Sequence, residues 1–196
     1  HLDVVKWLHE NRTEGCSVWA MNLSADKGHL DVVKWLHENR TEGCTHRALE
    51  LSANNGHLDV VKWLLTNRDE VCTVHVMGGA CGSGNLSLVK WLHENRSEGC
   101  TAGAMDWAAD QGHFHIVKWL HENRSEGCTE LAMDYAAEKN FYSILEFLYN
   151  NYKHLVTKVN NSTYEKLLPF IQEDFRKIFE KLEKENIVRE FISKKK

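Results

Sequence analysis

The twelve residues His1–Arg12 read HLDVVKWLHENR, and the same twelve residues return without a change at His29–Arg40. Four related segments follow at the same spacing: HLDVVKWLLTNR from His57, NLSLVKWLHENR from Asn85, HFHIVKWLHENR from His113 and a divergent FYSILEFLYNNY from Phe141. The six copies begin 28 residues apart, and no insertion interrupts them. Such strict periodicity predicts a solenoid, in which each repeat buries its apolar face against its neighbours.

Two helical patterns fill each repeat. In the first copy, five apolar residues between Leu2 and Leu8 spread over roughly 220° of a helix, which predicts burial against both neighbouring repeats. Asn11 is expected to end this helix in a left-handed conformation. The other pattern is clearest in Thr101–Gly112, where the threonine can cap a helix and the glycine can end it. The sequence therefore predicts an all-α fold, an α-solenoid of stacked helix-turn-helix repeats.

Both helical patterns resemble those of a known family. The run Gly28–Leu36, GHLDVVKWL, resembles the second helix of an ankyrin repeat, and AMDWAA at Ala104–Ala109 resembles the first. The resemblance covers residues 1–152 and implies a non-catalytic protein–protein interaction module. The period of 28 residues is shorter than the ankyrin period of about 33 and lacks the ankyrin proline. We therefore expect an array with reduced β-turn fingers.

Residues 153–196 depart from the repeat and are expected to form a helical cap on it. Ser162–Glu165 reads as a capping box, and Pro169 should kink or restart the helix that follows. Leu168-Pro169, followed by Ile178-Phe179 and Leu182, also resembles the F-box spacing, although the Ile-Phe pair lies two residues too far along. That resemblance implies a substrate adaptor of a ubiquitin ligase. Because the array opens on a second helix without its partner, we expect the chain to be a fragment of a larger protein.

Charge and hydropathy exclude several partners. Residues 1–151 carry 13 basic and 21 acidic side chains, a net of −8, which argues against nucleic acid. No apolar run approaches the roughly 18 residues of a membrane span, and no targeting segment opens the chain. Five of the six cysteines occupy one repeat position, where solenoid spacing predicts buried free thiols. Free thiols indicate a reducing, cytoplasmic location. The five cysteines at the shared repeat position are Cys16, Cys44, Cys72, Cys100 and Cys128.

Catalytic and ligand-binding patterns find little support. Most of the twelve histidines are repeat copies without zinc-ligand spacing, so we predict no metal and no cofactor. The glycine-rich stretch 78–84 falls in the first helix of its repeat, and no Gly-Lys-Ser/Thr follows it. We expect Gly79→Ala to stabilise that helix. No Ser/His/Asp or Cys/His arrangement stands apart from the repeats. We therefore predict that the chain is not an enzyme and binds no small-molecule substrate.

One face of the first helix varies among the copies, whereas the second helix is nearly constant. In the ankyrin family the first helices line the concave side, where partners usually bind. Six of the residues predicted to bind a partner are acidic and one is arginine, which favours a basic segment lying along the first helices of residues 101–138. Alternatively, this face varies because little constrains its solvent-facing residues. The chain would then be an architectural spacer of a large assembly. The predicted binding residues are Trp19, Asn22, Asp26, Arg47, Glu50, His75, Asp106, Trp107, Asp110, Asp134, Tyr135 and Glu138.

Overall fold

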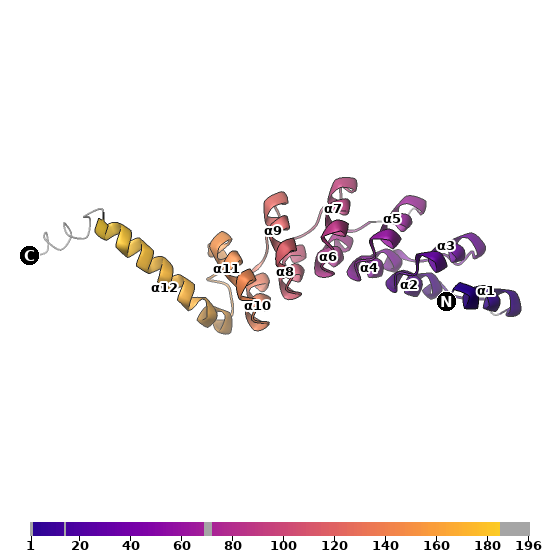
Figure 1. Ribbon diagram of the computed structural model, residues 1–196, viewed down its shortest axis with the longest axis horizontal. Coiled ribbons are helices and arrows are strands. Elements are labelled where there is room, and N and C mark those ends of the chain that lie inside the picture. Colours follow the sequence, from indigo (N-terminus) through magenta and orange to yellow (C-terminus); the bar gives the residue numbers. More distant parts are fainter. Residues whose placement is uncertain (1, 14, 69–71, 185–196) are drawn as a thin grey trace, which may run out of the picture. The chain divides into compact units, whose positions relative to one another are not determined.

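The computed structural model describes residues 2–13, 15–68 and 72–184, and within them every regular element is a helix. The second-helix pattern forms α1 (Leu2–Asn11), α3 (Leu30–Asn39), α5 (Leu58–Asn67), α7 (Leu86–Asn95), α9 (Phe114–Asn123) and α11 (Tyr142–Asn151). The first-helix pattern forms α2 (Trp19–Asp26), α4 (His46–Asn54), α6 (Val74–Gly82), α8 (Gly103–Asp110) and α10 (Glu130–Glu138). The predicted all-α fold of repeated helix pairs is confirmed (Figure 1).

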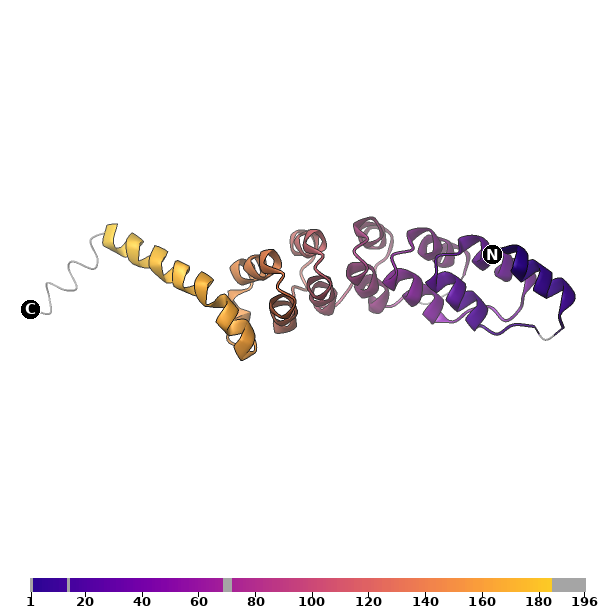
Figure 2. The ribbon, with the colours of Figure 1, turned by 60° about the horizontal axis from the view of Figure 1, so that its bottom comes forward.

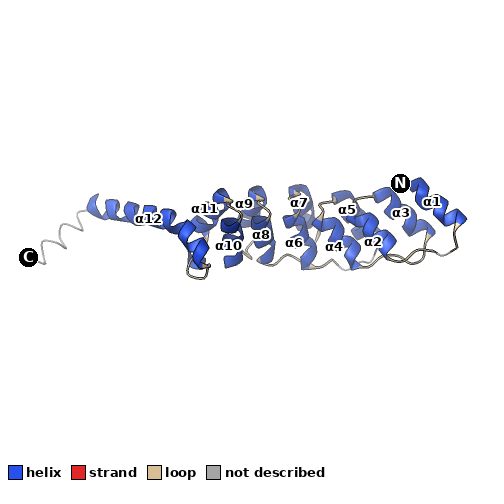
Figure 3. Cartoon of the chain, turned by 90° about the horizontal axis from the view of Figure 1, so that it is seen from below, coloured by secondary structure: helices blue, strands red, loops and turns tan. Residues whose placement is uncertain are grey.

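The chain divides into two compact units, His1–Thr129 and Glu130–Lys196. In the first unit the two kinds of helix form two layers. Figure 3 shows α3, α5, α7 and α9 in one row and α2, α4, α6 and α8 in the other. The second unit therefore includes α10 and α11 as well as the residues that follow the repeats. The predicted domain boundary after residue 152 marks the end of the repeat motif in the sequence, and it stays a prediction.

The core of the first unit lies between these two layers. Val33 and Leu36 of α3 are buried, as are their copies in α5, α7 and α9. From the other layer, fully buried alanines such as Ala48 and Ala53 allow the helices to approach closely. The repeated tryptophans are only partly buried. The Trp35 ring lies 5.1 Å from the His9 ring in an edge-on contact, and the same contact recurs at His37–Trp63 and His93–Trp119.

Glycine, not asparagine, adopts the left-handed conformation at the ends of helices in this unit. The expectation for Asn11 is wrong, because this residue stays helical and its side-chain amide donates to the Trp7 carbonyl at 2.8 Å. Gly28, which follows α2, has a φ of +73°, and a Cβ atom there would lie 2.6 Å from Nδ1 of His57. The His57 ring in turn contacts the Asp26 carbonyl through Nε2 at 3.0 Å. The repeated Gly-His pair therefore joins one repeat to the next.

The second unit contains α10, α11, a 3-10 turn (Lys153–Leu155) and α12 (Asn161–Lys184). Asn160, not Ser162, caps α12, because its Oδ1 accepts from the Thr163 N–H at 2.9 Å. The Tyr149 hydroxyl donates to Asp174 at 2.9 Å and ties α11 to α12. As expected from Pro169, the axis of α12 bends in its first half (Figure 2).

All six cysteines are free thiols, as predicted. Their burial differs from the prediction. Cys72 is buried, but its four counterparts in the other repeats are only half-buried. The sixth, Cys81 in α6, is fully buried, and desolvation raises the pKa of its thiol. The repeat position of the cysteines therefore lies at the edge of the core.

Candidate functional site

The structure divides the residues predicted to bind a partner into three groups. In the first unit, Trp19, Arg47, His75 and Trp107 are exposed, and Asp26, Glu50 and Asp110 are half-buried. In the second unit, Glu138 is exposed, and Asp134 and Tyr135 are half-buried. Asn22 and Asp106 are only 0% and 3% exposed, so the prediction that they face a partner is wrong.

The two buried residues bind the repeat that follows. Asn22 donates through Nδ2 to Oγ1 of Thr45 at 3.0 Å, and its Oδ1 accepts from the Thr45 N–H at 3.1 Å. Asp106 accepts from the Thr129 N–H at 2.9 Å and from its hydroxyl at 2.7 Å. In both pairs the threonine lies 23 residues farther along the chain. We call each pair a threonine latch, because it joins a residue of a first helix to the threonine 23 residues farther along the chain.

The other copies of this position behave differently. Glu50 accepts from the Thr73 hydroxyl at 3.5 Å, which makes a longer latch of the same spacing. Gly78 offers no side chain, so the latch toward Thr101 is missing. In the second unit Asp134 accepts from the Asn160 N–H at 3.1 Å instead. Variation at this position therefore reflects contacts between repeats as much as an exposed surface.

Charges on the first-helix face of the first unit are partly matched within the chain. Asp26 pairs with Lys27 at 2.9 Å and accepts from the Asn55 amide at 2.9 Å. The Arg47 guanidinium lies 5.6 Å from the centre of the Trp19 ring, in a cation–π contact between α2 and α4. What remains is a polar, mildly acidic face on which tryptophan rings are exposed.

A hollow interrupts this face beside α6, and we call it the glycine notch. Its volume is about 420 Å³, and its lining residues are Asn54, Gly79, Gly82, Trp107, Asp110 and Gln111. Equivalent positions to Gly79 hold large side chains in every other repeat: Leu23, Leu51, Trp107 and Tyr135. The notch therefore arises because one large side chain of this row is absent. From the sequence, these glycines predict only a weakened first helix, and the hollow is missed, although aligning the copies shows glycine where the others have a large side chain.

Close packing around Gly79 overturns the expectation that alanine there simply stabilises α6. A Cβ atom on Gly79 would lie 1.9 Å from Oδ1 of Asn54 and 3.2 Å from its backbone nitrogen. A Cβ atom on Gly78 would meet nothing within 4 Å. At Gly82 it would rest 3.4 Å from Cε3 of Trp107, an ordinary van der Waals distance. Three glycines of one helix thus have three different environments.

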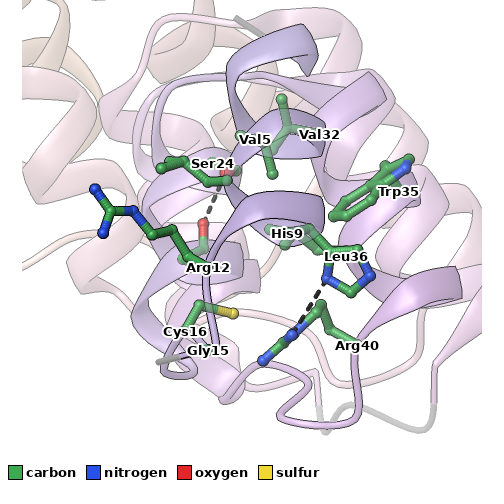
Figure 4. Close-up of a pocket in the computed structure, with 12 residues that line it drawn as sticks. Val5, His9, Arg12, Gly15, Cys16, Ser24, Val32, Trp35, Leu36 and Arg40 are labelled. Carbon is green, nitrogen blue, oxygen red and sulfur yellow. Dashed lines mark hydrogen bonds between the residues drawn. The ribbon is translucent and has the colours of Figure 1, made fainter.

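A second hollow, of about 530 Å³, lies among α1, α2 and α3 (Figure 4). Apolar side chains such as Val5, Leu36 and the Trp35 ring line much of it, and Nη1 of Arg40 contacts Nδ1 of His9 at 3.3 Å at its edge. No residue of α1 is buried, and Trp7 is exposed. This hollow reflects the sparse packing of α1 against its neighbours.

Arginine–glutamate pairs follow the second helices and shape the local electrostatics. Arg40 bonds Glu42 and lowers the pKa of that carboxyl to about 2, and Arg96 pairs with Glu98 at 2.5 Å. Within the described residues, no three histidine, cysteine or acidic side chains gather as metal ligands would. None of the helices in the described part of the chain is long and apolar enough to cross a membrane.

Comparison with known proteins gives two findings. A family model of ankyrin repeats, in three copies, matches residues 1–74 and again residues 77–160. Among solved structures, the ankyrin repeat domain of human ASB11 is similar, with a TM-score of 0.52 and 19% sequence identity over 71% of this chain and 69% of that one. At this identity the likeness concerns the fold. No curated protein matches the chain.

Proposed function

The chain belongs to the ankyrin-repeat family, and from that premise we propose that it is a non-catalytic module whose first-helix face binds a basic segment of another protein. Ankyrin repeats generally mediate protein–protein interaction. The observation that carries the proposal is the exposure of Trp19 and Trp107, at 46% and 50%, on one face of the first unit. Tryptophan is enriched among the residues that dominate binding energy at interfaces.

The charge of this face supports a basic partner. Asp26, Glu50 and Asp110 keep part of their surface exposed, and the arginine of the face already stacks on Trp19. Electrostatic attraction of this kind chiefly raises the association rate, and it weakens as salt screens the exposed charges. Asp106 is excluded from this role by its latch. The proposed surface is therefore smaller than the one that the sequence predicts.

The repeated polar residues support a non-catalytic role. Histidines within the second helices contact tryptophan rings of the following repeat. The histidines just before these helices contact carbonyl groups of the preceding repeat, so both sets have a structural function. Six free thiols support a reducing, intracellular location.

The test compares two surfaces of the same folded chain. A crosslinked partner should map to α2, α4, α6 and α8, and Trp19→Ala combined with Trp107→Ala should weaken binding at least tenfold. Lys34→Ala combined with Glu38→Ala, on the exposed side of α3, is the matched control and should leave binding unchanged. Crosslinks confined to α3 and its copies would contradict the proposal and support the architectural spacer.

A second candidate function rests on α12. Phe175 and Ile178 are exposed large apolar residues on this helix, and an exposed apolar patch here favours the ubiquitin-ligase adaptor. Phe179 and Leu182, which complete the F-box-like spacing, have side chains outside the described residues. Loss of a copurifying ubiquitin-ligase subunit from the Phe175→Ser variant, with Tyr164→Ser as the control, would support this candidate.

A further inference from the structure

The glycine notch has a size and a chemistry that suit one long side chain of a partner. Its volume of about 420 Å³ is many times the roughly 30 Å³ that a water molecule occupies in the liquid. Its lining includes Trp107, which is half exposed, and Gly79 and Gly82, which have no side chains to fill it. A side chain inserted here would occupy the place that leucine fills in the copies at Leu23 and Leu51.

The rim of the notch is polar. Asn54 and Asp110 contribute an amide and a carboxylate, and Gln111 donates to Asp110 at 2.5 Å. A purely apolar occupant would desolvate these groups without replacing their hydrogen bonds, which is unfavourable. A flat cation satisfies both parts of the site, because it stacks on an indole and donates hydrogen bonds in its own plane.

We propose that the glycine notch binds the guanidinium group of an arginine in the partner's basic segment. The guanidinium stacks on Trp107, and its N–H groups donate to Asp110 and to the Asn54 carbonyl oxygen. The same unit already contains a pairing of this kind, since the Arg47 guanidinium lies 5.6 Å from the Trp19 ring on the preceding first helices. Lysine fits less well, because its ammonium is a compact and strongly hydrated charge. This inference rests on the proposed function and specifies the residue that the site selects.

Two synthetic peptides of twelve residues provide the probe, one with four arginines in a Gly-Ser background and the other with four lysines in the same places. Both carry the same charge, so general attraction to the acidic face is equal. Titration into the ¹⁵N-labelled chain follows the seven tryptophan indole signals, and the signal lost in Trp107→Phe identifies Trp107. The arginine peptide should bind at least threefold more tightly and should shift the Trp107 signal most.

Two leucine substitutions on α6 separate the notch from the rest of the face. Gly82→Leu places a side chain against Trp107 and fills the notch, so the preference for arginine should disappear. Gly78→Leu points into open space on the same helix and should leave the preference intact. If Gly82→Leu disturbs the fold, Trp107→Ala removes the stacking wall from a half-exposed position and should abolish the preference in the same way.

The outcomes distinguish this inference from the proposed function. Equal affinity for the two peptides, with shifts on α2, α4 and α8, would overturn the arginine site and leave the basic-segment proposal intact. An arginine preference that survives both Gly82→Leu and Trp107→Ala would place the site elsewhere and would also overturn it. Failure of both peptides to bind the native chain would contradict both proposals.

Discussion

Alanine at Gly78 should stabilise the protein, whereas alanine at Gly79 should leave its stability unchanged or lower it. Both residues lie in the interior of α6, so each replacement gains the same intrinsic helix preference, about 1 kcal/mol. The two variants differ only in what the new methyl group meets. Comparing them therefore measures the packing contact and cancels the propensity.

The magnitude follows from the surroundings of each methyl group. At Gly78 nothing lies within 4 Å, so the gain of about 1 kcal/mol should appear in full. At Gly79 the methyl group would displace the Asn54 side chain from 1.9 Å and press on its backbone nitrogen at 3.2 Å. Overpacking of this kind typically costs about 1–3 kcal/mol. The net effect of Gly79→Ala should lie between about zero and a loss of 2 kcal/mol.

Urea denaturation followed by circular dichroism measures both free energies, and hydrogen exchange of the α6 amides tests whether the change is local. Truncating the Asn54 side chain gives a further control. In the presence of Asn54→Ala, the side-chain part of the clash is removed, so Gly79→Ala should recover much of its gain. A Gly79→Ala variant as stable as Gly78→Ala would refute the reasoning, because it would mean that Asn54 moves aside at no cost.

Three further outcomes are expected. Asp106→Ala removes the buried acceptor of two hydrogen bonds from Thr129 and should lower the free energy of unfolding by about 2 kcal/mol or more. Asp106→Asn should lower it less, and urea titration measures both variants. Glu42, Glu98 and Glu126 have pKa values lowered in the folded state, to about 2 for Glu42, by their arginine partners. Their contribution to stability is therefore complete above about pH 4.5 and is lost as the pH falls toward 2, so Glu42→Gln should flatten a plot of melting temperature against pH over that range. Unfolding without a reductant should expose six thiols to a thiol reagent, with Cys81 the slowest in the folded chain; a count of four or fewer would mean that disulfides form.

Periodicity made the fold of the repeats predictable. A helix that recurs every 28 residues with the same apolar positions can bury them only against its own copies, and Val33 and Leu36 are buried accordingly. The helix ends were less predictable, because both asparagine and glycine can end a helix. Only the structure shows that Asn39 bonds back to the Trp35 carbonyl while Gly28 takes the positive φ.

The candidate site was predicted in part, and the failures have a common physical cause. Variation among copies was interpreted as exposure, but a position can also vary because several side chains perform one buried task. Asn22 and Asp106 both accept a hydrogen bond from a threonine, which explains their burial and their different identities. Conversely, the hollow at Gly79 depends on an absent side chain, and its shape follows from neighbours on α4 and α8.

The threonine latches also bear on how such a chain can be inherited. The donor threonine is constant at Thr45, Thr73 and Thr129, whereas its acceptor is Asn, Glu or Asp 23 residues earlier. Recombination in register that removes the 28 residues 45–72 would bring Thr73 to the place of Thr45, where Asn22 supplies the same acceptor. Loss of residues 73–100 would delete Gly78 and set Thr101 opposite Glu50. Each of these two deletions would thus keep an acceptor opposite a threonine at the new junction, so the number of repeats could change without loss of a latch there.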